Sequence, residues 1–310
     1  MLTVLQTALE VGLIYGLVAL ALFISFSILN IADLSTDGCF TLGCAVGAML
    51  TIAGHPILAL FAAMAAGMLS GYVTAFLQTR LGVESILAGI ISNTGLYTIN
   101  LAVMGFSSNV SITGVDTVFL LFKGLVGGQW SRLILLALIA AVVVIVLIRF
   151  FGTSLGLSIR ATGDSLDMVS ASSINPKATI TIGLCLANAL TALSGCLIGE
   201  YNKFCDINLG TGMVTIALAS LIIGEVFAGH RGGVGKRIVC VVLGSIVYRF
   251  IIALALRLNI SAEYFKLVSA VIVAVAIAAP NMKGYVRLAK IKSNARKLRA
   301  LSGKGDETDA

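Results

Sequence analysis

Carboxylate and amide side chains inside long apolar stretches are the residues of this chain most able to do chemistry. A charge at the centre of a bilayer costs about 2.5–3.5 kcal/mol on insertion scales, so each one should face protein or a water-filled path. Asp33 and Asp37 lie four residues apart and share one face if their segment is helical. The pair either lines a solute path or caps a helix, with backbone N–H groups of a broken helix or a basic residue as partner. The candidates for lining a solute path are Asn30, Asp33, Asp37, Asn93, Asn100 and Asn188.

Other charged residues in apolar stretches are expected to find partners inside the protein. Arg249 lies between Tyr248 and Phe250 and is expected to form an internal ion pair rather than to bind a solute. The acidic residues of this kind are Glu10, Glu84, Glu200 and Glu225.

Enzymatic chemistry is not expected, because the motifs that would carry it are missing from the sequence. There is no His-Glu-x-x-His or Gly-x-Ser-x-Gly pattern, and His55 and His230 fall on opposite predicted faces. Residues 232–236 resemble a phosphate-binding loop, but His230 replaces its first Gly and Arg237 replaces its final Ser or Thr. The chain is therefore expected to be non-catalytic and not to hydrolyse ATP. The six cysteines lack metal-site spacing and are expected to be small buried residues.

The elements that position these residues are predicted to be membrane-spanning helices. Hydrophobic residues make up 58% of the chain and charged residues 11%, against roughly 45–50% and 25% in soluble domains. Apolar runs of about 20 residues cross a hydrocarbon core about 30 Å thick. The composition predicts an all-α, polytopic membrane protein of about nine transmembrane helices (eight to ten). The predicted segments are residues 3–29, 36–54, 57–79, 84–105, 132–151, 178–201, 213–229, 237–257 and 264–281.

The second and seventh of these segments are short and rich in Gly, Ser and Thr, so either is expected to be a broken or re-entrant helix. With the N-terminus outside, fifteen Lys and Arg residues fall on the inner side and five on the outer side. The net charge of +7 therefore reflects membrane topology and not nucleic-acid binding. Residues 1–282 are predicted to form the transmembrane domain, and residues 283–310 a basic cytoplasmic tail that faces lipid and is partly disordered.

A polar segment, residues 158–177, connects two apolar segments on the predicted inner side. Asp164 is expected to cap a helix that begins at Ser165, and Pro176 is expected to end that helix at Asn175. Its apolar side consists of Leu166, Met168, Val169 and Ala171, and Asp167 lies in its first turn. A helix of two turns is not stable alone. It is therefore either an ordinary loop that packs on its own bundle or a docking point for a soluble motor.

Three segments resemble permeases of the branched-chain amino-acid and ribose type of ABC importer: "SLGLSIRATGDSLDMVSASSINPKATI" (154–180), "NIADLSTDGCFTLGCAVGAML" (30–50) and "LGTGMVTIALASLIIGEVFAGHRGGVGKRIVCVVLGSI" (209–246). The resemblance extends over residues 5–282, with the greatest likeness to permeases for amino acids, including aromatic ones. It implies a type II-like importer fold with a cytoplasmic coupling helix. The sequence departs from the family at Asp37 and in its Ser-rich coupling segment. The residues expected to couple to the ATPase are Arg160, Asp164, Leu166, Asp167, Met168, Val169 and Ser173.

The resemblance also implies the partners. These are cytoplasmic ABC ATPase subunits, an extracellular substrate-binding lipoprotein, membrane lipid, and a second permease that is either another copy or a similar chain. ATP and Mg²⁺ are expected to bind the ATPase, so this chain needs no cofactor of its own. The chain is expected in the bacterial plasma membrane. Two alternatives remain at this point: an ABC permease for a sugar or nucleoside, and an ion-coupled secondary transporter in which Asp33, Asp37 or Glu225 titrates.

Overall fold

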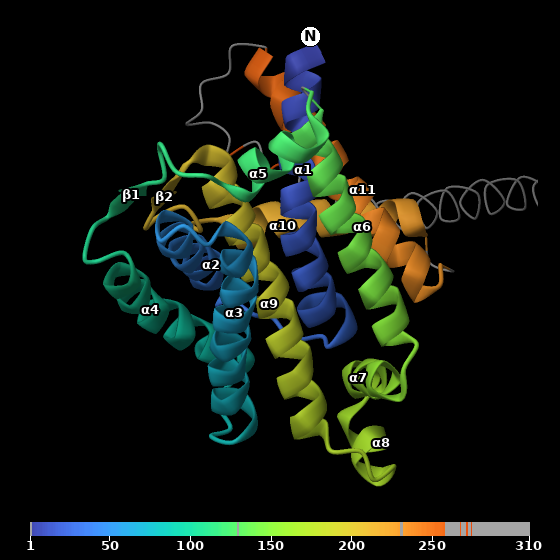
Figure 1. Ribbon diagram of the computed structural model, residues 1–310. Helices are drawn as coiled ribbons and strands as arrows, with labels where there is room; N and C mark the ends of the chain where they lie inside the picture. Colours follow the sequence, from blue (N-terminus) through green and yellow to red (C-terminus); the bar gives the residue numbers. More distant parts are fainter. Residues whose placement is uncertain are drawn as a thin grey trace, which may run out of the picture.

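A computed structural model of the chain describes residues 2–128, 130–229 and 232–257, together with positions 267, 271 and 274. The described residues form eleven α-helices, one π-helix and a two-stranded sheet (Figure 1). Most of the ninth predicted apolar segment, residues 264–281, lies outside the described residues. The same holds for the whole predicted tail, for His230 and for Arg231.

Six helical segments in the described part are long and apolar enough to cross a membrane. They are α1 (Leu2–Leu22) with the π-helix η1 (Phe23–Ile28), α3 (Pro56–Thr79), α4 (Ser85–Val103), α6 (Ser131–Phe151), α9 (Pro176–Asn202) and α11 (Val234–Arg257). Two further apolar helices are shorter, namely α2 (Thr36–Ile52) and α10 (Met213–Ala228). The all-α, multi-pass fold is thus confirmed, whereas the count of nine spans is not. The two segments that the sequence marked as short are these two helices.

Helix α9 forms the centre of the bundle, with α2 and α3 on one side and α1 on the other (Figure 1). Within the described residues, 83% of its apolar window is buried, against 22% for α6 and 28% for α4. Small residues allow this packing. A Cβ on Gly43 of α2 would lie 2.0 Å from the Ala192 carbonyl oxygen of α9, and one on Gly195 would lie 1.9 Å from the Phe40 carbonyl oxygen. Such backbone approach is how helices associate in lipid.

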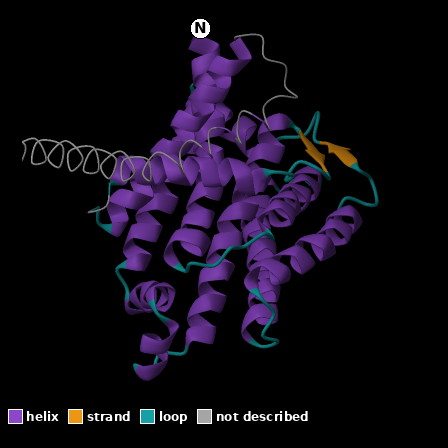
Figure 2. Cartoon of the chain, turned by 180° about the vertical axis from the view of Figure 1, so that it is seen from behind, coloured by secondary structure: helices purple, strands orange, loops and turns teal. Residues whose placement is uncertain are grey.

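The two ends of the bundle carry different small elements. At one end lie the N-terminus, helix α5 (Val118–Val126) and strand β1 (Asn109–Ser111), which pairs antiparallel with β2 (Phe204–Asp206). At the other end lie helices α7 (Ser154–Asp164) and α8 (Leu166–Ala171) (Figures 1 and 2). Residues 106–128 and residues 164–173 therefore lie at opposite ends, as the predicted topology requires. Following the charge prediction, we refer to these as the outer and the inner end.

The polar segment at the inner end folds differently from the sequence-based prediction. Asp164 is the last residue of α7 and does not cap α8; the cap is Ser165, whose hydroxyl accepts a hydrogen bond from the Met168 N–H at 3.3 Å. Helix α8 ends at Ala171, and Pro176 begins α9 instead of ending α8. Proline suits the first turn of a helix, where its missing N–H leaves no hydrogen bond unmade.

Candidate functional site

Helix α8 presents two large apolar side chains to the inner end. Leu166 is 53% exposed and Met168 is 54% exposed, whereas Val169 is 1% exposed. Val169 therefore packs the helix onto the bundle, while Leu166, Met168 and the smaller Ala171 of the predicted apolar side stay accessible to a partner. The remaining predicted coupling residues are also exposed on α7, on α8 or just beyond it: Arg160, Asp164, Asp167 and Ser173.

Helix α7 fixes this surface to the membrane helices. The hydroxyls of Thr162 on α7 and Thr179 on α9 are hydrogen-bonded at 2.8 Å. Gly163 lies directly on η1, because a Cβ at this position would be 1.8 Å from the Ile28 carbonyl oxygen. A displacement of α7 toward the bundle therefore acts on the backbone of η1 with no flexible side chain between them.

The π-helix η1 connects in turn to α10 and α11. Ser27 of η1 donates a hydrogen bond to the Glu225 carboxylate of α10. The Arg237 guanidinium of α11 donates to Ser27 Oγ and to Glu225 Oε1, both at 2.6 Å. It also lies 5.1 Å from the Phe23 ring centroid. The Arg237–Glu225 contact is the one ion pair in the described part of the chain. The sequence singled out Glu225 and Arg237, but a serine in an apolar run gave no signal that Ser27 would join them.

The Asp33 carboxylate has all its partners inside the protein. Oδ1 accepts from the Ser35 N–H at 2.8 Å and from the Ser35 hydroxyl at 2.6 Å. Oδ2 accepts from the Asn188 amide of α9 at 3.1 Å, and both side chains are buried. Asp33 thus anchors the segment before α2 to the central helix.

Asp37 lies in the first turn of α2 and caps a different helix, α10. Its two carboxylate oxygens accept hydrogen bonds from the backbone N–H groups of Gly212 and Val214 at the start of α10, each at 2.9 Å. Negative charge at a helix N-terminus is stabilising. These are the backbone partners that the sequence analysis had offered as one alternative. Because α2 begins at Thr36, Asp33 and Asp37 do not share a helix face.

The predicted polar residues gather around the start of α2, with one exception. Asn100 of α4 donates to the Gly38 carbonyl oxygen of α2 at 3.0 Å, and its own Oδ1 is buried with no partner. Asn93 lies beside the same glycine, since a Cβ at Gly38 would be 2.6 Å from Asn93 Oδ1. The exception is Asn30, which is exposed in a left-handed turn with φ 56°.

Arg249 forms no ion pair with any residue in the described part of the chain, so the predicted internal ion pair is wrong there. The Arg249 guanidinium instead lies over the Tyr15 ring, 3.8 Å from its centroid, and its Nε has no hydrogen-bond partner. A cation over an aromatic face gains electrostatic energy from the ring quadrupole. An aromatic ring of α1 thus takes the place of the acidic partner.

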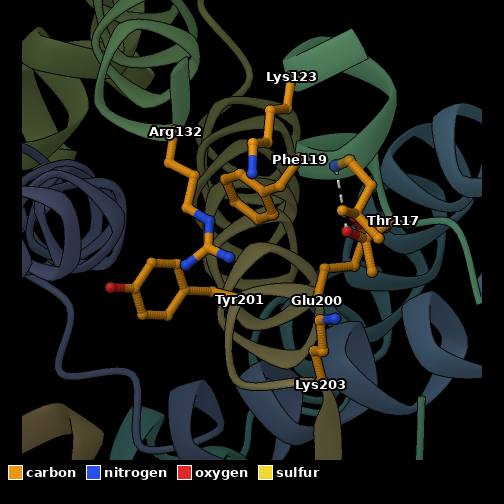
Figure 3. A pocket seen from close by; sticks show the side chains of 8 residues that line it. Thr117, Phe119, Lys123, Arg132, Glu200, Tyr201 and Lys203 are labelled. Carbon is orange, nitrogen blue, oxygen red and sulfur yellow. Dashed lines mark hydrogen bonds between the residues drawn. The ribbon is translucent and has the colours of Figure 1, made fainter. Parts of the chain in front are cut away.

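A pocket at the outer end was not predicted. It is lined by cationic, aromatic and polar side chains from α5, α6 and the end of α9 (Figure 3): Thr117, Phe119, Leu120, Lys123, Arg132, Glu200, Tyr201 and Lys203. The buried Glu200 carboxylate accepts from the Val118 N–H at 2.8 Å and from the Thr51 hydroxyl at 3.0 Å. Among the described residues, no cluster of His, Cys, Asp or Glu could hold a metal ion.

Comparison with known proteins decides the family. Residues 4–277 match the model of the family described as "Branched-chain amino acid transport system / permease component". The chain belongs to this family of permeases. The permease is 31% identical over 272 residues to a "Tyrosine transport system permease protein" of Clostridioides difficile (strain R20291), covering 87% of this chain and 89% of the relative. It is 30% identical over 277 residues to an uncharacterized protein of Rickettsia prowazekii (strain Madrid E), covering 88% and 96%. No solved structure matches.

Family membership establishes the general function of the permease. It is a multi-pass component of an ABC transport system, and such systems generally combine a permease with an ATPase and a binding protein. The family does not assign roles to individual side chains. The predicted coupling residues and solute-path residues therefore stay predictions, to which the geometry now adds exposure and partners.

Proposed function

We propose that the permease carries an amino acid inward as the membrane subunit of an ATP-driven importer, working as a pair of copies. A relative named for tyrosine transport supports an amino acid over a sugar or nucleoside. In this proposal, an extracellular binding protein delivers the solute to the outer end. A separate ATPase, which binds ATP and Mg²⁺, docks on α7 and α8, so the permease itself needs no cofactor.

The observation that carries this proposal is the pair of exposed apolar side chains on α8. Burying a side chain of this size is worth about 1.5–3 kcal/mol, so leaving two in water is costly unless a partner covers them. Ser165 and Val169 hold the six-residue helix in place while Leu166 and Met168 point away from the bundle. A groove on a soluble ATPase provides the missing apolar contact.

The proposed mechanism passes ATPase movement through η1. Movement of α8 and α7 acts at Gly163 on the Ile28 backbone, and Ser27 carries it to the Glu225–Arg237 pair on α10 and α11. π-Helical turns are rare, and those that occur inside α-helices are frequently found at functional sites. The bundle then alternates between two packings, whose relative stability the docked ATPase changes.

In the same proposal, the solute passes near the polar cluster between α2 and α4. Asn93 and Asn100 line its path, because the Asn100 carbonyl oxygen is free to accept a hydrogen bond. Asp33 and Asp37 position α2 and α10, since both carboxylates already accept several hydrogen bonds from this chain. An ion-coupled mechanism would need a titrating carboxylate, and Asp33, Asp37 and Glu225 are all occupied by internal partners.

Co-purification and uptake test the proposal. An ATP-hydrolysing subunit should co-purify with the permease, and uptake into vesicles should require ATP. Leu166→Asp or Met168→Asp should reduce uptake per ATP hydrolysed at least tenfold without lowering the melting temperature. Leu81→Asp, the same exchange at a leucine that is 62% exposed in the turn between α3 and α4, is the matched control and should leave uptake unchanged. Normal ATP-driven uptake in both α8 variants would refute the docking role.

A further inference from the structure

The first membrane span ends in η1, whose turns are wider than those of the α-helix before it. The Leu29 N–H donates to the Ile24 carbonyl oxygen, five residues back, at 3.0 Å. The Ile31 N–H donates to the Ser25 carbonyl oxygen, six residues back, at 2.8 Å, and Asn30 between them has a left-handed φ of 56°. In an α-helix each N–H bonds the carbonyl four residues back. Each hydrogen-bonded turn of η1 therefore encloses one residue more than an α-helical turn.

An α-helix over the same residues would keep the number of hydrogen bonds at Ser25. The Leu29 N–H would then donate to the Ser25 carbonyl oxygen, four residues back. It would displace the Ile31 N–H, which follows the exposed Asn30 and can bond to water or to the chain elsewhere. One hydrogen bond thus replaces another. Two conformations with similar hydrogen bonding are close enough in free energy for a contact elsewhere to shift the balance between them.

The local sequence gives η1 only a weak preference for the α-helix. Its six residues, FISFSI, are aromatic, β-branched or Ser, whereas α1 is rich in Leu and Ala. The Ser25 hydroxyl also donates to the Ala21 carbonyl oxygen, four residues back, at 3.4 Å. A serine that bonds the backbone in this way often bends its helix. The conformation of η1 is therefore set by its contacts with other helices.

Contacts with three helices hold η1 in the π-form. Gly163 of α7 lies so close to the Ile28 carbonyl oxygen that no Cβ would fit between them. Ser27 donates to Glu225 of α10 and accepts from Arg237 of α11, the latter at 2.6 Å. Successive residues of an α-helix point about 100° apart. Loss of the extra residue from the wide turn would therefore rotate Ser27 by about 100°, away from Glu225 and Arg237.

We propose that η1 is a conformational switch that converts between π- and α-helix. In the π-form Ser27 ties α1 to α10 and α11, and in the α-form it releases both helices. Movement of α7 drives the conversion, because Gly163 contacts the Ile28 backbone directly. This inference rests on the proposed importer function, in which the ATPase moves α7. It supplies the element with two discrete conformations that coupling between distant sites requires.

Deletion of Phe26 tests the proposal, because it removes the extra residue while the segments on both sides keep their positions. Phe26 is 46% exposed, so little packing is lost with it. Ser27 and Ile28 then keep their contacts in a continuous α-helix that has no extra residue left to release. In vesicles that contain the complete complex, the ATPase should stay bound and the melting temperature should stay near that of the wild type. Uptake per ATP hydrolysed should fall about tenfold or more.

Two controls separate helix length from side-chain loss and from misfolding. Phe26→Ala removes the same side chain but keeps the length, and it should couple hydrolysis to uptake as the wild type does. Deletion of Leu13 shortens α1 where the helix is α-helical. It rotates the preceding residues by about 100° and should lower the melting temperature steeply.

The outcomes distinguish the switch from the importer function. Wild-type coupling after deletion of Phe26 overturns the proposal, and so does an equal loss of coupling in Phe26→Ala. A melting temperature as low as that after deletion of Leu13 also overturns it, because η1 then contains no extra residue. If the wild-type complex itself takes up no solute with ATP, the importer function fails. If the wild type and the Phe26 deletion both take it up, only the switch fails.

Discussion

Gly163→Ala tests whether movement of the coupling surface reaches the bundle through η1. The new Cβ would lie 1.8 Å from the Ile28 carbonyl oxygen and 3.0 Å from Leu29 Cα. Carbon and oxygen atoms normally approach to about 3.3–3.6 Å, so α7 must withdraw from η1 by about 1.5 Å. Overpacking of this kind costs about 1–3 kcal/mol. Neither backbone atom can rotate away, so the contact between α7 and η1 itself must open.

We expect Gly163→Ala to lower the melting temperature and, in addition, to reduce uptake per ATP hydrolysed while the ATPase stays bound. The assay compares ATP hydrolysis and solute uptake in the same vesicles, with co-purification as the measure of docking. Gly95→Ala on α4 is the control, because nothing lies within 4 Å of its added Cβ. If Gly163→Ala couples hydrolysis to uptake as the wild type does, movement does not pass through this contact.

Three further substitutions test the contacts that hold the bundle. Asp37→Ala removes the cap of α10 and should lower the free energy of unfolding by about 1–2 kcal/mol. Asp37→Asn should cost less, because its amide oxygen keeps one of the two hydrogen bonds. Thermal melting distinguishes the two variants, and equal melting temperatures would contradict the capping role. Glu225→Gln should cost about 1 kcal/mol or less, because the side chains of Glu225 and Arg237 are 35% and 31% exposed. Uptake should fall further than stability does, and exchanging the two charges should restore it; failure of the exchange would argue against the relay. Gly43→Ala places a Cβ 2.0 Å from the Ala192 carbonyl oxygen and should cost about 1–3 kcal/mol, so an unchanged melting temperature would contradict the close packing of α2 on α9.

Asp33 and Asp37 show how much of the site the sequence alone predicts. It identified Asp37 as a charge that needs a partner and offered backbone N–H groups of a broken helix among the candidates. It had no means of finding Gly212 and Val214, which lie 175 and 177 positions away along the chain. It placed Asp33 and Asp37 on one face only if their segment is helical, and α2 begins at Thr36, between the two.

Helix α8 also shows what the sequence predicts and what only packing decides, here among neighbouring residues. Spacing grouped Leu166, Met168, Val169 and Ala171 on one apolar side, and packing on the bundle then buried Val169 alone. The cap was misplaced by one residue, since Asp164 and Ser165 are both good N-caps and their order is set by where α7 ends. The predicted tail and most of the predicted ninth span lie outside the described residues, and their boundary at residue 282 stays a prediction.

The sequence by itself determined that this is a polytopic helical membrane protein, where eight of its apolar helices lie, and which polar segment faces the inner end. Those features depend on run length, hydropathy and charge, which are properties of neighbouring residues. Only the tertiary structure decided that Ser27 joins Glu225, 198 positions away, and that three outer cations from separate helices share one pocket. Such meetings depend on how closely whole helices pack, and small residues such as Gly43, Gly163 and Gly195 set that distance.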